Sequence, residues 1–209
     1  NHLGAELARR GFTVVSGLAY GIDTAAHKGA LDAGGRTIAV LGSGVGRVYP
    51  KKHTALAERI AEHGAVLSEY GLDAEPDAPH FPERNRILSG LALGTLVVES
   101  YAEGGALITA RLALEQNREV FALPGRITKD SSRGTNRPIQ NGHAKLVLEV
   151  DDLLEELPAV VVDDPDTVDA ETVSSGAGRD PTEEPSGEAE RLYDALSETP
   201  VHIDALCEE

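Results

Sequence analysis

The chain has 209 residues, among them 35 acidic and 19 basic side chains, and a formal net charge of −16. This length suffices for one well-buried domain and a fragment of another. The single cysteine, Cys207, excludes an internal disulfide framework, and no apolar run approaches the roughly 20 residues that a membrane helix needs. We therefore expect a cytoplasmic protein with no signal peptide and no membrane partner.

Most of the negative charge lies beyond the first 148 residues. Residues 1–148 hold 17 basic and 15 acidic side chains, whereas residues 149–190 hold one basic and 15 acidic ones. An acidic total normally argues against nucleic-acid binding. Because the acidic residues are concentrated in one later tract, that argument does not apply to the first 148 residues.

Short apolar strands alternate with amphipathic helices along the first 123 residues. We expect strands over residues 13–15, 37–41, 65–68, 95–98 and 119–123. We expect helices over residues 3–10, from Asp23 onward, and over 50–63, 83–93 and 106–117. This alternation is typical of a parallel sheet with helices on both faces, so it predicts an α/β, Rossmann-like domain over residues 1–157.

The composition changes after Leu157. Residues 158–188 contain Pro, Gly, Ser, Thr and acids but few apolar side chains, so they are predicted to be an acidic flexible linker. An acidic arm with a partner of its own is the alternative. Residues 189–209 regain a helical pattern, but this segment is too short to bury a core of its own.

The segment SGLAYGIDTAAH, residues 16–27, turns the chain from the first strand into a helix. Small residues in a turn allow a phosphate or another backbone to approach closely. The small residues here are Ser16, Gly17, Ala19 and Gly21. Asp23 and Thr24 are expected to cap the following helix, whose free N–H groups attract anions.

The segment FPERNRILSGL, residues 81–91, places two cations at a helix start. Arg84 and Arg86 flank Asn85 where the helix dipole normally favours acids. This placement predicts that they bind an external anion. The alternative is that they form ion pairs with the chain's own carboxylates, namely Glu83, Glu99 or Glu103. Phe81 either stacks on a base or fills the sheet edge.

A third candidate segment follows the strand that ends at Glu99. Gly104 and Gly105 begin a helix that includes Thr109, so its first N–H groups are available to a phosphate. Ligands of open α/β sheets bind at the carboxyl ends of the strands. We therefore expect this loop, residues 16–21 and Arg84 to form one groove.

Two further loops leave alternatives open. The sequence GSGVG, residues 42–46, suggests a dinucleotide fingerprint, but Arg47 stands where the third glycine belongs, so a structural turn or a phosphate contact is favoured over an NAD site. Residues 125–145 form one long connection with five basic side chains, which is either an ordinary mobile loop or a structured part of the groove. These side chains are Arg126, Lys129, Arg133, Arg137 and Lys145.

Four segments, residues 16–27, 81–91, 97–110 and 120–125, together closely resemble the DprA/Smf family of bacterial DNA-processing proteins. The resemblance implies a groove that binds the sugar-phosphate backbone of single-stranded DNA, loading of the RecA recombinase in transformation or recombination, and a homodimer. It also implies structured roles for Gly134, Asn136 and Gly142. The DNA-binding residues expected are Ser16, Gly17, Ala19, Tyr20, Gly21, Asp23, Arg84, Asn85, Arg86, Gly104, Gly105, Thr109 and Lys129.

The same resemblance marks two departures from the family pattern. Family members usually have a strand and a GSR-like loop before the first helix, and we expect this first strand to be absent here. Residues 189–209 are similar to the opening of a winged-helix module, so only part of that module is expected.

Catalysis is the alternative to binding. Enzymes that cleave the base from nucleoside monophosphates share a related fold and use a glycine loop with a catalytic Glu, but the segment EGGALITARLALE has no Glu at the matching spacing. The sequence also lacks a Cys/His metal cluster and a P-loop. We therefore expect no catalytic residue, no metal and no cofactor.

Overall fold

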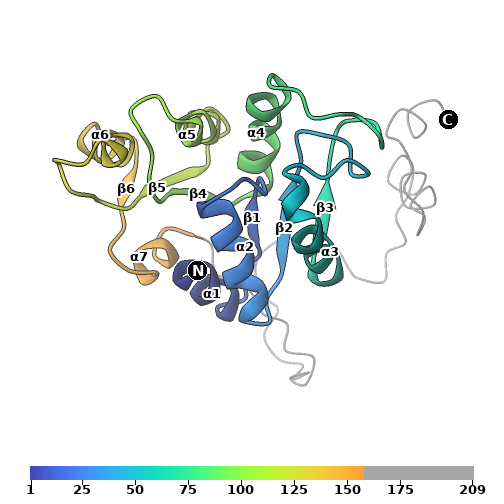
Figure 1. Ribbon diagram of the computed structural model, residues 1–209. Helices are drawn as coiled ribbons and strands as arrows, with labels where there is room; N and C mark the ends of the chain where they lie inside the picture. Colours follow the sequence, from blue (N-terminus) through green and yellow to red (C-terminus); the bar gives the residue numbers. More distant parts are fainter. Residues whose placement is uncertain (158–209) are drawn as a thin grey trace, which may run out of the picture. The chain divides into compact units, whose positions relative to one another are not determined.

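A computed structural model describes residues 1–157 (Figure 1). The linker predicted over residues 158–188 and the segment predicted over 189–209 lie outside the described residues. Among the helices described, none is long and apolar enough to cross a membrane.

Strands and helices alternate along the described chain, as predicted. The strands are β1 (Val14–Ser16), β2 (Thr37–Val40), β3 (Ala65–Leu67), β4 (Gly94–Val97), β5 (Glu119–Ala122) and β6 (Lys145–Leu146). The α-helices are α1 (His2–Arg9), α2 (Ile22–Asp32), α3 (Thr54–His63), α4 (His80–Leu91), α5 (Gly105–Glu115), α6 (Arg133–Gln140) and α7 (Asp151–Leu154). Two short 3₁₀-helices, η1 (Lys51–His53) and η2 (Asp130–Ser132), precede α3 and α6.

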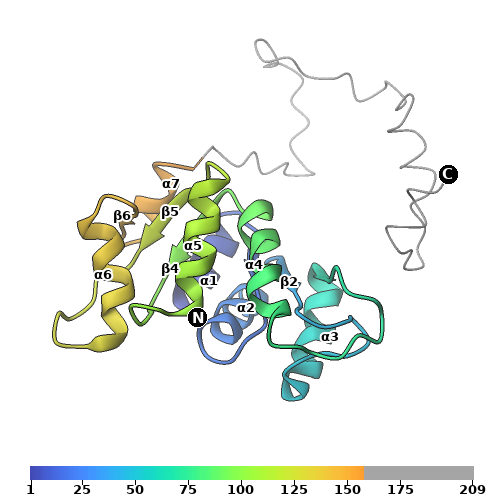
Figure 2. The ribbon, with the colours of Figure 1, turned by 90° about the horizontal axis from the view of Figure 1, so that it is seen from above.

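All strands pair in parallel, which confirms the predicted α/β class, but they form two sheets. One sheet has the order β1-β2-β3 and the other the order β4-β5-β6. Helices α2 and α3 pack on the first sheet, and α4 lies beside α5 (Figures 1 and 2). The most buried strands are β2 and β5, the central strand of each sheet, whereas β1 and β4 are edge strands.

Each sheet has its own apolar core. Leu18, Leu41 and Ile60 belong to a cluster between the first sheet and its helices. Val97 and Val120 belong to a second cluster with small residues of α5. Since burial of a large apolar side chain contributes about 1.5–3 kcal/mol, these clusters fix the strand ends from which the functional loops emerge.

The prediction of one long connection over residues 125–145 was wrong. This stretch contains η2, α6 and β6. Gly134 lies so close to the loop after β4 that an added Cβ would meet the carbonyl oxygen of Tyr101 at 2.4 Å. The side chain of Asn136 exchanges two hydrogen bonds of 2.9 Å with the backbone of Gly125. Gly142 has a positive φ of 71° just after α6.

Candidate nucleic-acid interface

The loop after β1 is held in shape by Asp23. Its carboxylate accepts hydrogen bonds from the backbone N–H groups of Gly17 and Ala19, both at 3.1 Å. The Thr24 hydroxyl donates to the carbonyl of Ala19 at 2.7 Å. The prediction that Asp23 and Thr24 cap the helix was wrong, because α2 begins after Gly21 without a side-chain cap. The carboxylate of Asp23 instead satisfies two N–H groups of the loop that precedes the helix.

Leu18 anchors the same loop in the core. This side chain is fully buried although its backbone has a positive φ of 59°, a conformation that L-residues rarely adopt. The Nδ1 of His53 lies 2.8 Å from the Leu18 carbonyl, so the ring carries its proton there and donates it. The loop is thus held by the buried side chain of Leu18 and by the hydrogen bond from His53 of η1.

Arg84 is buried beneath this loop. The residue is 5% exposed, and its guanidinium donates to the carbonyls of Gly17, at 3.1 Å, and Val40. A Cβ on Gly17 would lie 2.6 Å from Nη2 of Arg84, so glycine is required for this approach. Burial lowers the pKa of Arg84, and the charge of nearby Asp23 partly offsets that effect. Arg84 therefore supports the loop from inside, and its predicted contact with DNA stays a prediction.

The other two predicted cations are exposed and form ion pairs. Arg86 pairs with Glu69, a partner that the sequence alternatives did not include. Lys129 pairs with Glu99, which also accepts a hydrogen bond from Ser131. These hydrogen bonds, Lys129 first, lower the pKa of Glu99. Exposed pairs of this kind contribute little to stability and exchange readily with another anion.

The two glycines at the start of α5 differ in their surroundings. Gly104 lies against Ser100, where an added Cβ would meet the hydroxyl at 2.1 Å, whereas nothing lies within 4 Å of a Cβ on Gly105. The N–H of Gly104 donates to the Tyr101 carbonyl at 3.0 Å. A side chain at Gly105 would thus meet open space, and the anion contact predicted for this helix start stays a prediction.

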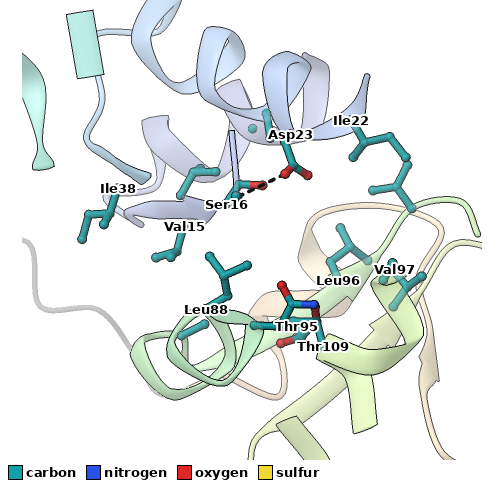
Figure 3. Close-up of a pocket in the computed structure, with 18 of the residues that line it drawn as sticks. Val15, Ser16, Ile22, Asp23, Ile38, Leu88, Thr95, Leu96, Val97 and Thr109 are labelled. Atoms are coloured by element: carbon teal, nitrogen blue, oxygen red, sulfur yellow. Dashed lines mark hydrogen bonds between the residues drawn. The ribbon is translucent and has the colours of Figure 1, made fainter. Parts of the chain in front are cut away.

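A cavity of about 1060 Å³ lies between β1 and β4, and it gathers most of the predicted site residues. Figure 3 shows Val15, Ser16 and Asp23 on one wall, with Leu88, Thr95 and Thr109 across from them. Nine of the predicted residues line the cavity: Ser16, Gly17, Ala19, Tyr20, Asp23, Arg84, Asn85, Gly105 and Thr109. Gly21, Arg86, Gly104 and Lys129 do not line it, and Lys129 lines a smaller cavity of about 370 Å³.

The backbone N–H groups of the glycine loop after β2 are hydrogen-bonded within the chain. The N–H groups of Gly44 and Gly46 donate to the carbonyls of Ala74 and Leu72, both at 2.9 Å. A Cβ on Gly44 would lie 2.2 Å from the Gly71 carbonyl oxygen. These contacts favour the structural turn over the dinucleotide site.

Sequence reasoning left several residues of this edge out of the site. Tyr49 lines the large cavity beside Phe81, the residue for which base stacking and filling of the sheet edge were both considered, and their ring centroids lie 5.6 Å apart. Lys51 and Lys52 follow Tyr49 and are exposed. The signal that identifies Tyr49, Lys51 and Lys52 is position, because they follow the strand ending at Val40 and so lie at the carboxyl edge of the sheet.

Comparison with known proteins assigns this chain to a family. The model of the DNA recombination-mediator protein A family matches residues 1–158. Protein Smf of Escherichia coli K12 is 53% identical over 152 residues, which cover 72% of this chain and 40% of that protein. DNA processing protein DprA of Bacillus subtilis is 46% identical over 158 residues, which cover 76% of this chain and 53% of that protein. The chain thus spans about half the length of these relatives.

Two solved structures share the fold. The X-ray structure of DNA processing protein A from Streptococcus pneumoniae has a TM-score of 0.66 at 44% identity and covers 76% of this chain and 58% of that one. The structure of DNA processing protein A from Helicobacter pylori, a protein described for its unique single-stranded DNA binding mode, has a TM-score of 0.67 at 31% identity. It covers 75% of this chain and 72% of that one.

Proposed function

We propose that this chain, which belongs to the DNA recombination-mediator protein A (DprA/Smf) family, binds single-stranded DNA where β1, β2 and β4 end. The observation on which this rests is the convergence of nine predicted residues on one cavity. The ligand class is supported by the single-stranded DNA binding of the Helicobacter pylori relative. Binding protects exposed strands in DNA processing and recombination.

The contacts in this proposal divide into two groups. Asp23 and Arg84 hold the loop after β1, because their hydrogen bonds go to its backbone. The N–H groups at the start of α5, with Lys129, contact phosphates. Since phosphates lack base identity, binding through them is independent of sequence.

The proposal extends to the wider role that the family resemblance implies. The protein acts without catalysis in the cytoplasm, as a homodimer, and delivers single strands to the RecA recombinase. The segment EGGALITARLALE supports the absence of catalysis, because it has no Glu at the spacing of the nucleoside monophosphate hydrolases.

Titration of the purified chain with labelled single strands, duplexes and nucleoside monophosphates tests the function. We expect affinity for single strands to exceed affinity for duplex and to vary little among mixed sequences. Equal affinity for duplex would contradict the proposal. Release of free base from a nucleoside monophosphate, dependent on Glu99 or Glu103, would move the protein to the enzyme class.

A further inference from the structure

The tyrosines of this chain are distributed unevenly over the sheet edges. All four tyrosines of residues 1–157 lie on segments that leave the carboxyl ends of strands: Tyr20 after β1, Tyr49 after β2, Tyr70 after β3 and Tyr101 after β4. The segments that enter these strands from the preceding helices contain none. The rings therefore gather at the edge where the proposed function places DNA.

Three of these tyrosines are open to solvent. Tyr20 is 62% exposed, Tyr49 is 49% exposed and Tyr101 is 66% exposed. Large aromatic rings are normally buried, because each removes a large apolar area from water. Tyr70 differs, since its ring stacks on His80 at 3.8 Å and its hydroxyl donates to Glu83 at 3.3 Å.

Two of the exposed rings contact neighbouring rings. Tyr20 lies edge-on to His53 with ring centroids 4.7 Å apart, and Tyr49 contacts Phe81. Tyr20 and Tyr49 line the large cavity, and Tyr101 lines the smaller one. Ile22 and Glu99 line both cavities, so the three rings border one continuous surface.

The positive charge at this edge is mostly engaged. Arg84 donates to backbone carbonyls, Arg86 and Lys129 have carboxylate partners, and Arg47 lies 3.5 Å from Glu75. Lys51 and Lys52, beside Tyr49, form no ion pair with another residue of 1–157. Arg126, exposed after β5, likewise has no carboxylate partner among residues 1–157, whereas the paired cations must first give up a carboxylate to neutralise a phosphate.

From these observations we propose that the bases of the single strand stack on Tyr20, Tyr49 and Tyr101, with Lys51 and Lys52 contacting the adjacent phosphates. The proposal rests on the function proposed above and deepens it, because it makes the bases the main source of affinity. Every base has an aromatic face, so stacking tolerates any sequence. Binding through stacking falls less steeply with salt than binding through phosphates.

The test compares an oligothymidine with an abasic oligomer of equal length, which keeps the phosphates and lacks the bases. We expect the full chain to bind the oligothymidine more tightly than the abasic oligomer. Tyr20→Ala, Tyr49→Ala and Tyr101→Ala each lower affinity for oligothymidine between about 5- and 150-fold. The corresponding Tyr→Phe variants retain affinity, because the ring remains.

Tyr70→Leu is the matched control, since this tyrosine lies at the same edge with its ring already stacked on His80, and the variant is expected to bind like the unchanged protein. Melting temperatures show whether each variant folds. Equal affinity for both oligomers, or alanine variants that fold and bind normally, would overturn stacking and leave the DNA-binding function standing. Failure of the unchanged chain to bind either oligomer would overturn both.

Discussion

Gly17 is the point where the loop after β1 approaches the buried guanidinium of Arg84. The sequence indicated that small residues here admit a phosphate or another backbone, but the group admitted at Gly17 is a side chain of the same protein. A buried cation bonded to carbonyls is not visible in the local sequence, because its partners lie 67 and 44 positions away along the chain. The sequence identified Gly17 and Arg84 as site residues, but it did not indicate that they contact each other.

We predict that Gly17→Ala destabilises the fold by about 1–3 kcal/mol, because its Cβ displaces the Arg84 guanidinium from its two carbonyls. Gly105→Ala is the matched control, since its Cβ meets open space at a helix start and alanine is the better helix former. Urea denaturation measures both. Equal stability of the two variants would show that the Arg84 contact is dispensable.

At the scale of elements, the sequence predicted the first five strands and helices α1 to α5 to within a few residues of their ends. It missed α6, because RGTNRPIQ contains a proline and few apolar side chains. Tertiary contacts form this helix: Gly134 donates its N–H to Ser100 at 2.8 Å, and Asn136 bonds Gly125. It also missed β6, whose two residues carry no strand pattern of their own.

His27 joins three elements through one chain of hydrogen bonds. Its Nδ1 lies 2.7 Å from the Thr37 hydroxyl, which donates to the Val14 carbonyl at 2.6 Å, so Nδ1 carries the proton. Helix α2 is thereby tied to β2 and β1. Burial lowers the pKa of His27 to about 4, because the charged ring is not solvated there.

When folding lowers the pKa of a group, that group contributes stability at pH values above its pKa in the unfolded chain. This contribution is lost as the pH falls through the pKa of the folded state. With an unfolded pKa of 6.5, this contribution is present at pH 7 and lost between about pH 6.5 and 4, at a cost of about 3 kcal/mol. We predict that His27→Asn, which keeps a donor for Thr37, flattens the dependence of melting temperature on pH in this window. A slope unchanged from that of the parent would contradict this assignment.

For the molecule as a whole, the predicted parallel α/β fold is confirmed, but its division into two sheets was not predicted. Periodicity identifies strands and does not say which strands pair. The cavity lies between β1 and β4, which are edge strands of the two sheets. The site residues were predicted from loops at strand ends and included Tyr20, but Tyr49 and Tyr101 were left out because an aromatic side chain alone does not indicate whether it is buried.

The open edges of β1 and β4 have a consequence for hydrogen exchange. Amides along a strand point alternately to its two sides. Val14 donates to Arg36 on the β2 side, so the amide of Val15 points toward the cavity and has no strand partner among the described residues. In β2 both sides are paired. We predict that Val15 exchanges its amide proton far faster than Val14 or Ala39, measured by NMR in deuterated water. Slow exchange at Val15 would contradict this prediction and show that its amide is protected along that edge.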